Sequence, residues 1–188
     1  IPSVVLLPSP VQVSLSNYHV WRQVSDRAGE LSHTRLTNYV ANRAEELNFV
    51  EHHLREALAA GRRILAISLS KDQLIALHER FPESGLITGD VKGAEARQKA
   101  LSEHQLTFGI ASLTREALDE KELDTLFILT EFKAEGMLQQ SVGRTQRFLH
   151  DRQKDCRVVV VQHKHVEGMR HRAYQMVRYF RSQGFTVE

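Results

Sequence analysis

The chain contains one cysteine, four prolines and no long apolar run. The single cysteine, Cys156, excludes an intrachain disulfide and favours an intracellular location, cytoplasmic or nucleoid-associated. No apolar run approaches the roughly 20 residues that span a bilayer, so we expect no membrane partner. The chain begins at Ile1 without a basic leader or a small-residue cleavage site. We therefore expect no signal peptide, and the missing initiator methionine suggests a fragment cut from a longer polypeptide.

Two motifs of nucleotide-binding proteins are also missing. The sequence contains no G-x-x-x-x-G-K-[ST] loop and no acidic box of the Asp-Glu-x-His or Asp-Glu-Ala-Asp type. The first cradles phosphates with backbone N–H groups, and the second holds Mg²⁺. A chain without them is expected not to hydrolyse ATP by itself.

The composition that is present fits one globular domain. The chain has 188 residues, of which 41% are hydrophobic and 26% charged, so it can bury a substantial core. Its net charge is only +2, but residues 140–188 carry ten Lys or Arg against four Asp or Glu. This basic C-terminal third is compatible with a polyanionic ligand, either nucleic acid or nucleotide.

Short apolar runs alternate with stretches of helical periodicity. The pattern predicts strands near 64–67, 86–87, 107–111, 125–130 and 157–161, with a last strand near 185–187. It predicts helices over about 36–60, from Ser70, over 94–101 and over 166–182. This alternation is typical of an α/β fold, a parallel β-sheet flanked by helices on both faces. We expect residues 36–188 to form this domain, and residues 1–35 to form an extended arm or linker with an edge strand.

Ligands of such sheets bind beyond the carboxyl ends of the strands. The segments expected there are rich in hydroxyls and contain a glycine: Ser68–Ser70, Thr88–Asp90 and Ser112–Asp119. Hydroxyl and backbone N–H donors suit a sugar–phosphate backbone. A helix N-cap is the simpler interpretation of Ser70 alone.

The segment Gln140-Ser-Val-Gly-Arg-Thr-Gln-Arg147 follows the strand predicted at 125–130. Steps of four and three residues place Gln140, Arg144 and Arg147 on one face of a helix. Two guanidiniums and an amide suit a phosphate chain, and Gly143 leaves room for close approach. The spacing by itself favours a solvated basic face on a surface helix.

Together and in this order, these segments resemble the second, C-terminal RecA-like domain of superfamily 2 DEAD/DEAH-type helicases and translocases. The similarity runs from about Gly61 to Val161. It rests on Ile64–Ser70, on Leu86–Asp90 with Arg97, on Ser112–Asp119 with the following Leu123-Asp-Thr-Leu, and on Gln140–Arg147.

The resemblance implies a motor domain that closes on ATP and Mg²⁺ held mainly by an N-terminal RecA-like domain of the same polypeptide. It implies that Arg144 and Arg147 are arginine fingers and that Gln140 senses or positions the γ-phosphate. It also implies that Gly143 lies near the nucleotide and that Asp119 meets the nucleotide ribose or the arginine fingers themselves. One nucleic-acid strand, DNA favoured over RNA, would meet Ser68, Thr88, Gly89, Ser112 and Arg115. The sequence departs from the family pattern at Ala117, where glycine is usual, and a methyl group there narrows the approach to the nucleotide.

Three other interpretations stay open. A non-catalytic, helicase-like module that binds nucleic acid or protein would use the same basic surface. The pairs His52-His53 and His163-x-His165 suggest a metal, but no third or fourth ligand is evident, so we expect none. The arginines of the last predicted helix, at 170, 172, 178 and 181, either touch nucleic acid or form a solvated face.

Overall fold

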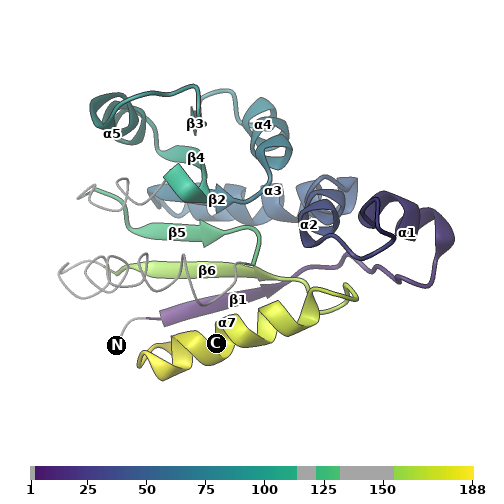
Figure 1. Cartoon of the computed structure of the whole chain (residues 1–188). Coiled ribbons are helices and arrows are strands. Elements are labelled where there is room, and N and C mark those ends of the chain that lie inside the picture. The colour runs from purple at the N-terminus through teal and green to yellow at the C-terminus, as the bar shows by residue number, and fades with distance from the viewer. Residues whose placement is uncertain (1–2, 114–121, 132–154) are drawn as a thin grey trace.

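The computed structural model of the chain describes residues 3–113, 122–131 and 155–188. Its centre is a seven-stranded sheet in the order β3-β4-β2-β5-β6-β1-β7, in which every pairing is parallel (Figure 1). The strands are β1 (Ser3–Pro8), β2 (Ile64–Ser68), β3 (Gly85–Ile87), β4 (Leu106–Ile110), β5 (Thr125–Ile128), β6 (Arg157–Gln162) and β7 (Thr186–Val187). The predicted α/β fold with a parallel sheet is confirmed.

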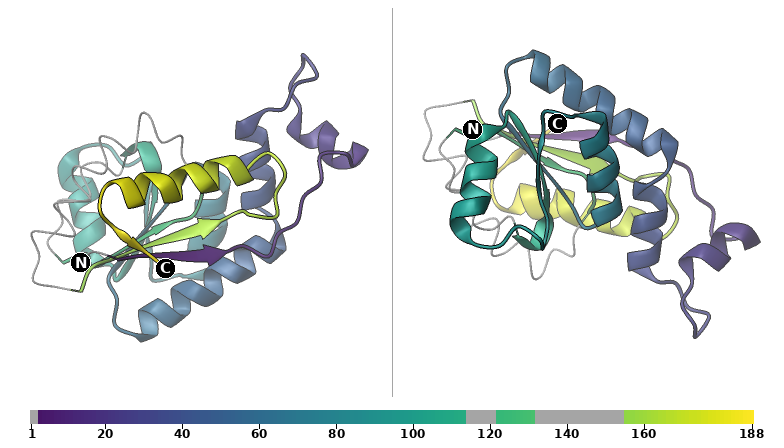
Figure 2. Two further views of the ribbon diagram at one scale, coloured as in Figure 1. Left: turned by 90° about the horizontal axis from the view of Figure 1, so that it is seen from below. Right: turned by 90° about the horizontal axis from the view of Figure 1, so that it is seen from above.

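Helices cover both faces of this sheet, as the two views of Figure 2 show. They are α1 (Tyr18–Val24), α2 (His33–Ala41), α3 (Ala44–Ala59), α4 (Lys71–Arg80), α5 (Ala94–Glu103) and α7 (Arg170–Ser182), with a 3₁₀ turn, η1 (Ala111–Leu113). Along β6, Val158 and Val160 pack in the core beneath α5 and α7, whereas Val159 and Val161 pack in the core beneath α3 and α4. Because the strand is buried on both sides, its sequence is apolar throughout.

The single helix predicted over 36–60 is wrong, because two helices, α2 and α3, meet at Asn42 and Arg43. Asn42 caps α2, and its side-chain amide donates to the backbone oxygen of Asn38 and to Ser70 Oγ at 3.2 Å. Arg43 then has extended backbone, with ψ at 142°. An amide side chain that bonds the preceding turn competes with helical hydrogen bonding, which ends α2 at this point. The bend also turns Glu46, on the first turn of α3, into the protein interior.

The segment predicted as an extended arm contains a full strand of the sheet. β1 pairs with β6 from Ser3 to Pro8, and β7 pairs with the other side of β1 at Ser3 and Val4. β1 is therefore not the edge strand that its prolines suggested. Residues 9–35 continue from β1 beyond the carboxyl ends of the strands and carry α1 (Figures 1 and 2). A separate apolar cluster that includes Val24, Leu36 and Met169 packs this segment against α2 and the start of α7.

The last helix begins at Arg170, four residues later than the predicted start at 166. Gly168 precedes it with a φ of +91°, and a Cβ atom at this position would lie 3.0 Å from Leu36 Cδ2. Positive φ is costly for residues with a side chain, so the chain turns at this glycine before the helix can start.

We expect Gly168→Ala to lower the free energy of unfolding by about 1–2 kcal/mol, because the substitution combines backbone strain with a clash against Leu36. Gly29→Ala is the matched control, since Gly29 has a φ of +78° but open space around it. Denaturant unfolding of both variants measures the difference. Equal losses would show that Leu36 gives way without cost.

In the described part of the chain, no helix is long and apolar enough to cross a membrane.

Candidate nucleic-acid interface

The carboxyl ends of the parallel strands meet along one edge of the sheet, and the predicted contact segments that the structure describes lie there. In the order of the sheet, Thr88 and Gly89 follow β3, Ser112 follows β4, and Ser68 ends β2. Neighbouring strands are about 4.8 Å apart, so these segments form a row along one edge. The sequence predicted this row because all the strands are parallel.

Ser68 is fully buried, and its hydroxyl has two partners inside the protein. Its Oγ donates to Gln73 Oε1 at 2.7 Å and accepts the backbone N–H of Ser70 at 3.0 Å. Ser70 caps α4 by accepting from the backbone N–H of Gln73, as the sequence predicted. A phosphate contact by Ser68 stays a prediction, and its observed bonds fix the shape of the loop. In that loop the backbone N–H of Leu69 donates to Thr130 Oγ1, which joins the ends of β2 and β5.

Thr88 and Gly89 form a turn at the end of β3. The backbone N–H of Val91 donates to the Thr88 carbonyl oxygen at 3.0 Å, and the Thr88 hydroxyl lies 3.3 Å from a carboxylate oxygen of Asp90. Gly89 is exposed, its φ is not positive, and a Cβ there would touch nothing within 4 Å. The protein itself therefore does not require glycine at this position, whereas a ligand approaching the backbone closely would.

Ser112 lies exposed in η1, directly after β4. The other predicted site residues lie outside the described residues: Arg115, Asp119, Gln140, Gly143, Arg144 and Arg147. Their assignments stay predictions.

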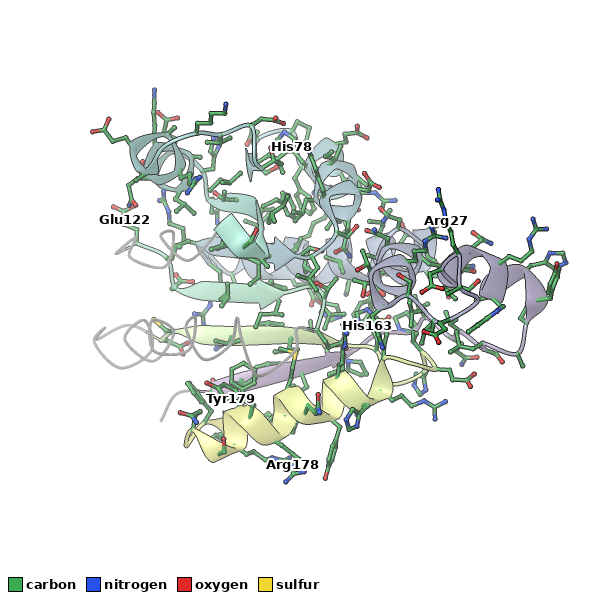
Figure 3. All side chains as sticks on the ribbon, in the orientation of Figure 1. Arg27, His78, Glu122, His163, Arg178 and Tyr179 are labelled. Atoms are coloured by element: carbon green, nitrogen blue, oxygen red, sulfur yellow. The ribbon has the colours of Figure 1, made fainter. Side chains whose placement is uncertain are left out.

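The same edge contains a buried ionic cluster that the sequence did not predict. His163, directly after β6, donates its backbone N–H to Glu131 Oε1 at 2.7 Å, and its Nδ1 lies 2.8 Å from Glu131 Oε2. Its Nε2 lies 2.9 Å from Glu46 Oε2 on α3, and that oxygen also accepts from the Ser9 hydroxyl at 2.9 Å. All four residues are at most 1% exposed. The cluster joins β1, β5, β6 and α3, and Figure 3 shows His163 near the carboxyl ends of the strands.

The electrostatics of this cluster favour a charged histidine. Burial by itself lowers the pKa of His163, but the carboxylates of Glu131 and Glu46 outweigh burial and raise the pKa to about 10. One imidazolium then faces two carboxylic side chains, and Glu46 Oε1 has no hydrogen-bond partner among the described residues. Removing one partner of such a buried ion pair is strongly destabilising, because the other charge stays buried without compensation.

A sequence signal for part of the cluster exists. Glu131 and His163 each follow a strand that is apolar along its length, which is the place where parallel sheets expose polar groups. Glu46 could not be found in this way, because its burial depends on the bend between α2 and α3.

The histidine pairs do not form a metal site in the part of the chain that the structure describes. His163 is occupied by two glutamates, whereas His165 is exposed. His52 and His53 lie next to Glu56 on α3.

A separate hollow of about 610 Å³ lies at the opposite, amino-terminal edge of the sheet. It is bounded by the ends of α3, α4 and α5 and by the start of β4, with Arg80, Phe81 and His104 in its wall. Since the predicted contact residues that the structure describes lie at the carboxyl edge, this hollow is not part of the candidate interface.

Comparison with known proteins gives a result for the fold alone. No protein-family model matches the chain, and no curated protein matches it. Among solved structures, the C-terminal part of the Fun30 ATPase domain matches 72% of the chain with a TM-score of 0.53 and 9% identity. The Hef helicase domain of Pyrococcus furiosus matches 71% with a TM-score of 0.53 and 15% identity. UvsW of T4 matches 99% with a TM-score of 0.67 and 8% identity.

The chain has the fold of a helicase domain. It covers 46%, 28% and 40% of the Fun30, Hef and UvsW chains, so it spans less than half of each. The match to UvsW extends over nearly the whole chain and therefore includes β1 and most of residues 9–35. The RecA-like architecture that the sequence motifs implied is confirmed. Of the predicted contact residues, Ser68, Thr88, Gly89 and Ser112 lie at the edge where such sheets bind ligands.

Proposed function

We propose that the chain is the C-terminal motor domain of an ATP-dependent nucleic-acid helicase or translocase of superfamily 2. In this function Arg144 and Arg147 stabilise charge on ATP held by an N-terminal RecA-like domain of the same polypeptide. Gln140 positions the γ-phosphate, and Gly143 and Asp119 lie close to the nucleotide. An intracellular location is part of the proposal and rests on the single cysteine.

One observation carries the proposal: the parallel sheet brings Thr88, Gly89 and Ser112 to one edge in the order of strands β3 and β4. Gly89 and Ser112 are exposed there, and the buried Thr88 fixes the turn beside them by accepting the backbone N–H of Val91. Hydroxyl and backbone donors in a row suit successive phosphates of one strand and read no base. Ser68 and Arg115 complete the proposed set of strand contacts, with DNA favoured over RNA.

The residues of this chain fit a role in supplying charge to ATP that another domain binds, rather than a role in binding ATP and Mg²⁺ themselves. The sequence has no phosphate-cradling loop, and the described residues contain no group of ligands suited to a metal ion. ATP supplies the phosphoryl group that is transferred, and its Mg²⁺ would be held by the other domain. The contribution of this chain is positive charge from Arg144 and Arg147, which acts only when the two domains close.

We expect the isolated chain to hydrolyse ATP at the background rate. Joined to its ATP-binding half, it should show hydrolysis that nucleic acid stimulates. Phosphate release measured with and without a single strand tests both statements. Robust turnover by the isolated chain would contradict the proposal, because the sequence has no phosphate-cradling loop of the G-x-x-x-x-G-K-[ST] type.

A non-catalytic module is the second candidate. It would bind nucleic acid or a partner protein through the same edge but would give no stimulated hydrolysis when joined to an ATP-binding half. The joined assay therefore separates the two functions without any assumption about affinity.

A further inference from the structure

The outer face of α7 combines three arginines with an exposed aromatic ring. Arg170, Tyr174, Arg178 and Arg181 are separated by four, four and three positions, which places them on one side of the helix. All four are exposed, Tyr174 at 61%, whereas Ala173, Met176 and Phe180 on the other side are buried in the core. Figure 3 shows Arg178 projecting from α7 away from the sheet.

This face continues into a shallow hollow of about 430 Å³ at the carboxyl edge of the sheet. The hollow lies between residues 12–14, the loop after β6 and the start of α7, and its wall includes Lys164, His165 and Arg170. We call Lys164, His165, Arg170, Tyr174, Arg178 and Arg181 the basic tract. Arg170 belongs both to the hollow and to the helix face, so the basic tract is continuous.

Little negative charge opposes the basic tract. The sequence has no acidic residue between Glu167 and Glu188, and a carboxylate oxygen of Glu167 accepts the backbone N–H of Leu15. Within the described part of the chain, Arg170, Arg178 and Arg181 make no ion pair.

Arg172 and the contact between Arg178 and Tyr174 decide which groups of this surface are available to a ligand. Arg172 does not belong to the basic tract, because it is half-buried and interacts electrostatically with Glu131. The guanidinium of Arg178 lies 5.9 Å from the centre of the Tyr174 ring. The exposed aromatic ring is thus covered on one side by a cation, which makes it less available for stacking on an unpaired base.

We infer that the basic tract binds the phosphate backbone of duplex DNA, on a surface separate from the row of strand-end contacts. Arg170 and Arg181 are eleven residues apart, which is about 16 Å along a helix. The major groove of B-form DNA is about 12 Å wide, so cations at the two ends of α7 can reach phosphates on both sides of it. A-form RNA has a narrow major groove that this spacing does not match.

The inference rests on the proposed function and deepens it. The strand-end contacts account for one nucleic-acid strand at the carboxyl edge, and the basic tract starts at that edge and runs along the outer face of α7. A motor at a junction would then hold the strand at one surface and the adjoining duplex at the other. The contact is to phosphates alone, so it is independent of base sequence and sensitive to salt.

The test measures fluorescence anisotropy of the whole 188-residue chain with three labelled probes. They are a mixed-sequence DNA duplex of about two helical turns, the corresponding single strand, and an RNA duplex of equal length. The double variant Arg178→Gln with Arg181→Gln should weaken binding of the DNA duplex about tenfold or more. The slope of log affinity against log salt concentration should become shallower by an amount that corresponds to about two phosphate contacts. Single-strand binding should stay close to that of the parent chain.

The control double variant, Arg27→Gln with Lys99→Gln, removes the same charge from exposed positions outside the basic tract. Equal duplex affinity in the two double variants would overturn the inference, as would a parent chain that does not bind the DNA duplex. Equal losses on all three probes would also overturn it, because the surface would then attract any polyanion. Nucleic-acid-stimulated ATP hydrolysis by the joined domains tests the proposed motor function separately. The motor function and duplex binding by the basic tract can therefore fail independently.

Discussion

Replacing Arg144 or Arg147 by alanine is expected to lower the kcat of nucleic-acid-stimulated ATP hydrolysis by about 10³–10⁵. The assay uses this chain joined to the proposed ATP-binding domain. An arginine finger stabilises the negative charge that develops on the transferred phosphoryl group. In a closed site, water cannot replace this stabilisation. Either loss should therefore act on the chemical step more than on nucleotide affinity.

Arg144→Lys and Arg147→Lys sharpen this expectation. Lysine keeps the positive charge but lacks the planar fork of donors that meets two phosphate oxygens together. If the guanidinium geometry matters, both lysine variants should lose most of the activity. If only the net positive charge of the C-terminal third matters, they should keep it.

The controls for these variants use binding and an unrelated cation. Single-strand affinity should persist in the alanine variants, because the contacts proposed for the strand lie at other residues, such as Thr88 and Ser112. Arg27→Ala removes an exposed arginine outside the proposed sites and should keep the parent rate. Unchanged hydrolysis in both Arg144→Ala and Arg147→Ala would favour the non-catalytic binding module.

The second large effect concerns folding stability at the carboxyl edge. His163→Gln is expected to lower the free energy of unfolding by about 3–5 kcal/mol, because two buried carboxylic side chains lose the cation between them. For a domain of this size that corresponds to a fall in Tm of roughly 10 °C. The exposed His165, two residues along the chain, supplies the matched control His165→Gln, which should unfold like the parent.

The effect should depend on pH with a definite sign. The pKa of His163 is about 10 in the folded chain against 6.5 for an ordinary histidine. The folded state therefore holds this proton more tightly, and the stabilisation is fully present below pH 6.5. It is lost as the pH rises through about 10. Glu131 also interacts electrostatically with Arg172, whose pKa is lowered by burial and partly restored by that carboxylate.

Denaturant unfolding across this window gives the measurement. The difference in stability between the parent and His163→Gln should shrink steadily from neutral toward alkaline pH. A constant difference would show that His163 is neutral in the folded protein. The double variant Glu131→Gln with His163→Gln tests the pairing, because its loss should be smaller than the sum of the two single losses.

The alternating architecture could be predicted from the sequence because most local signals agreed with the fold. β6 shows this agreement, since its four consecutive valines predicted a strand, and the structure packs them alternately into two cores. Ser70 predicted the start of α4 in the same way, because an N-cap is decided by the neighbouring turn. Placement of Thr88, Gly89 and Ser112 at one edge then followed from parallel strands alone.

Other features required contacts between distant segments. The periodicity of residues 36–60 continues across the break at Asn42, so it could not reveal that Asn42 bonds Ser70 and ends α2. The prolines in and next to β1 suggested an edge strand, because proline cannot donate a hydrogen bond to a neighbouring strand. The position of β1 between β6 and β7 depends instead on pairing with segments more than 150 residues away in the sequence. No pattern within a short window records such a pairing.

The buried ionic cluster shows the same division. By itself the sequence determined that Glu131 and His163 follow buried strands and that Glu46 lies on an amphipathic helix. Only the tertiary structure decided that the three side chains meet in the interior, because their meeting requires β5, β6 and the bend before α3 together. A charged residue is read from sequence as exposed, since burial is costly unless a partner is present, and the partner here is supplied by the fold.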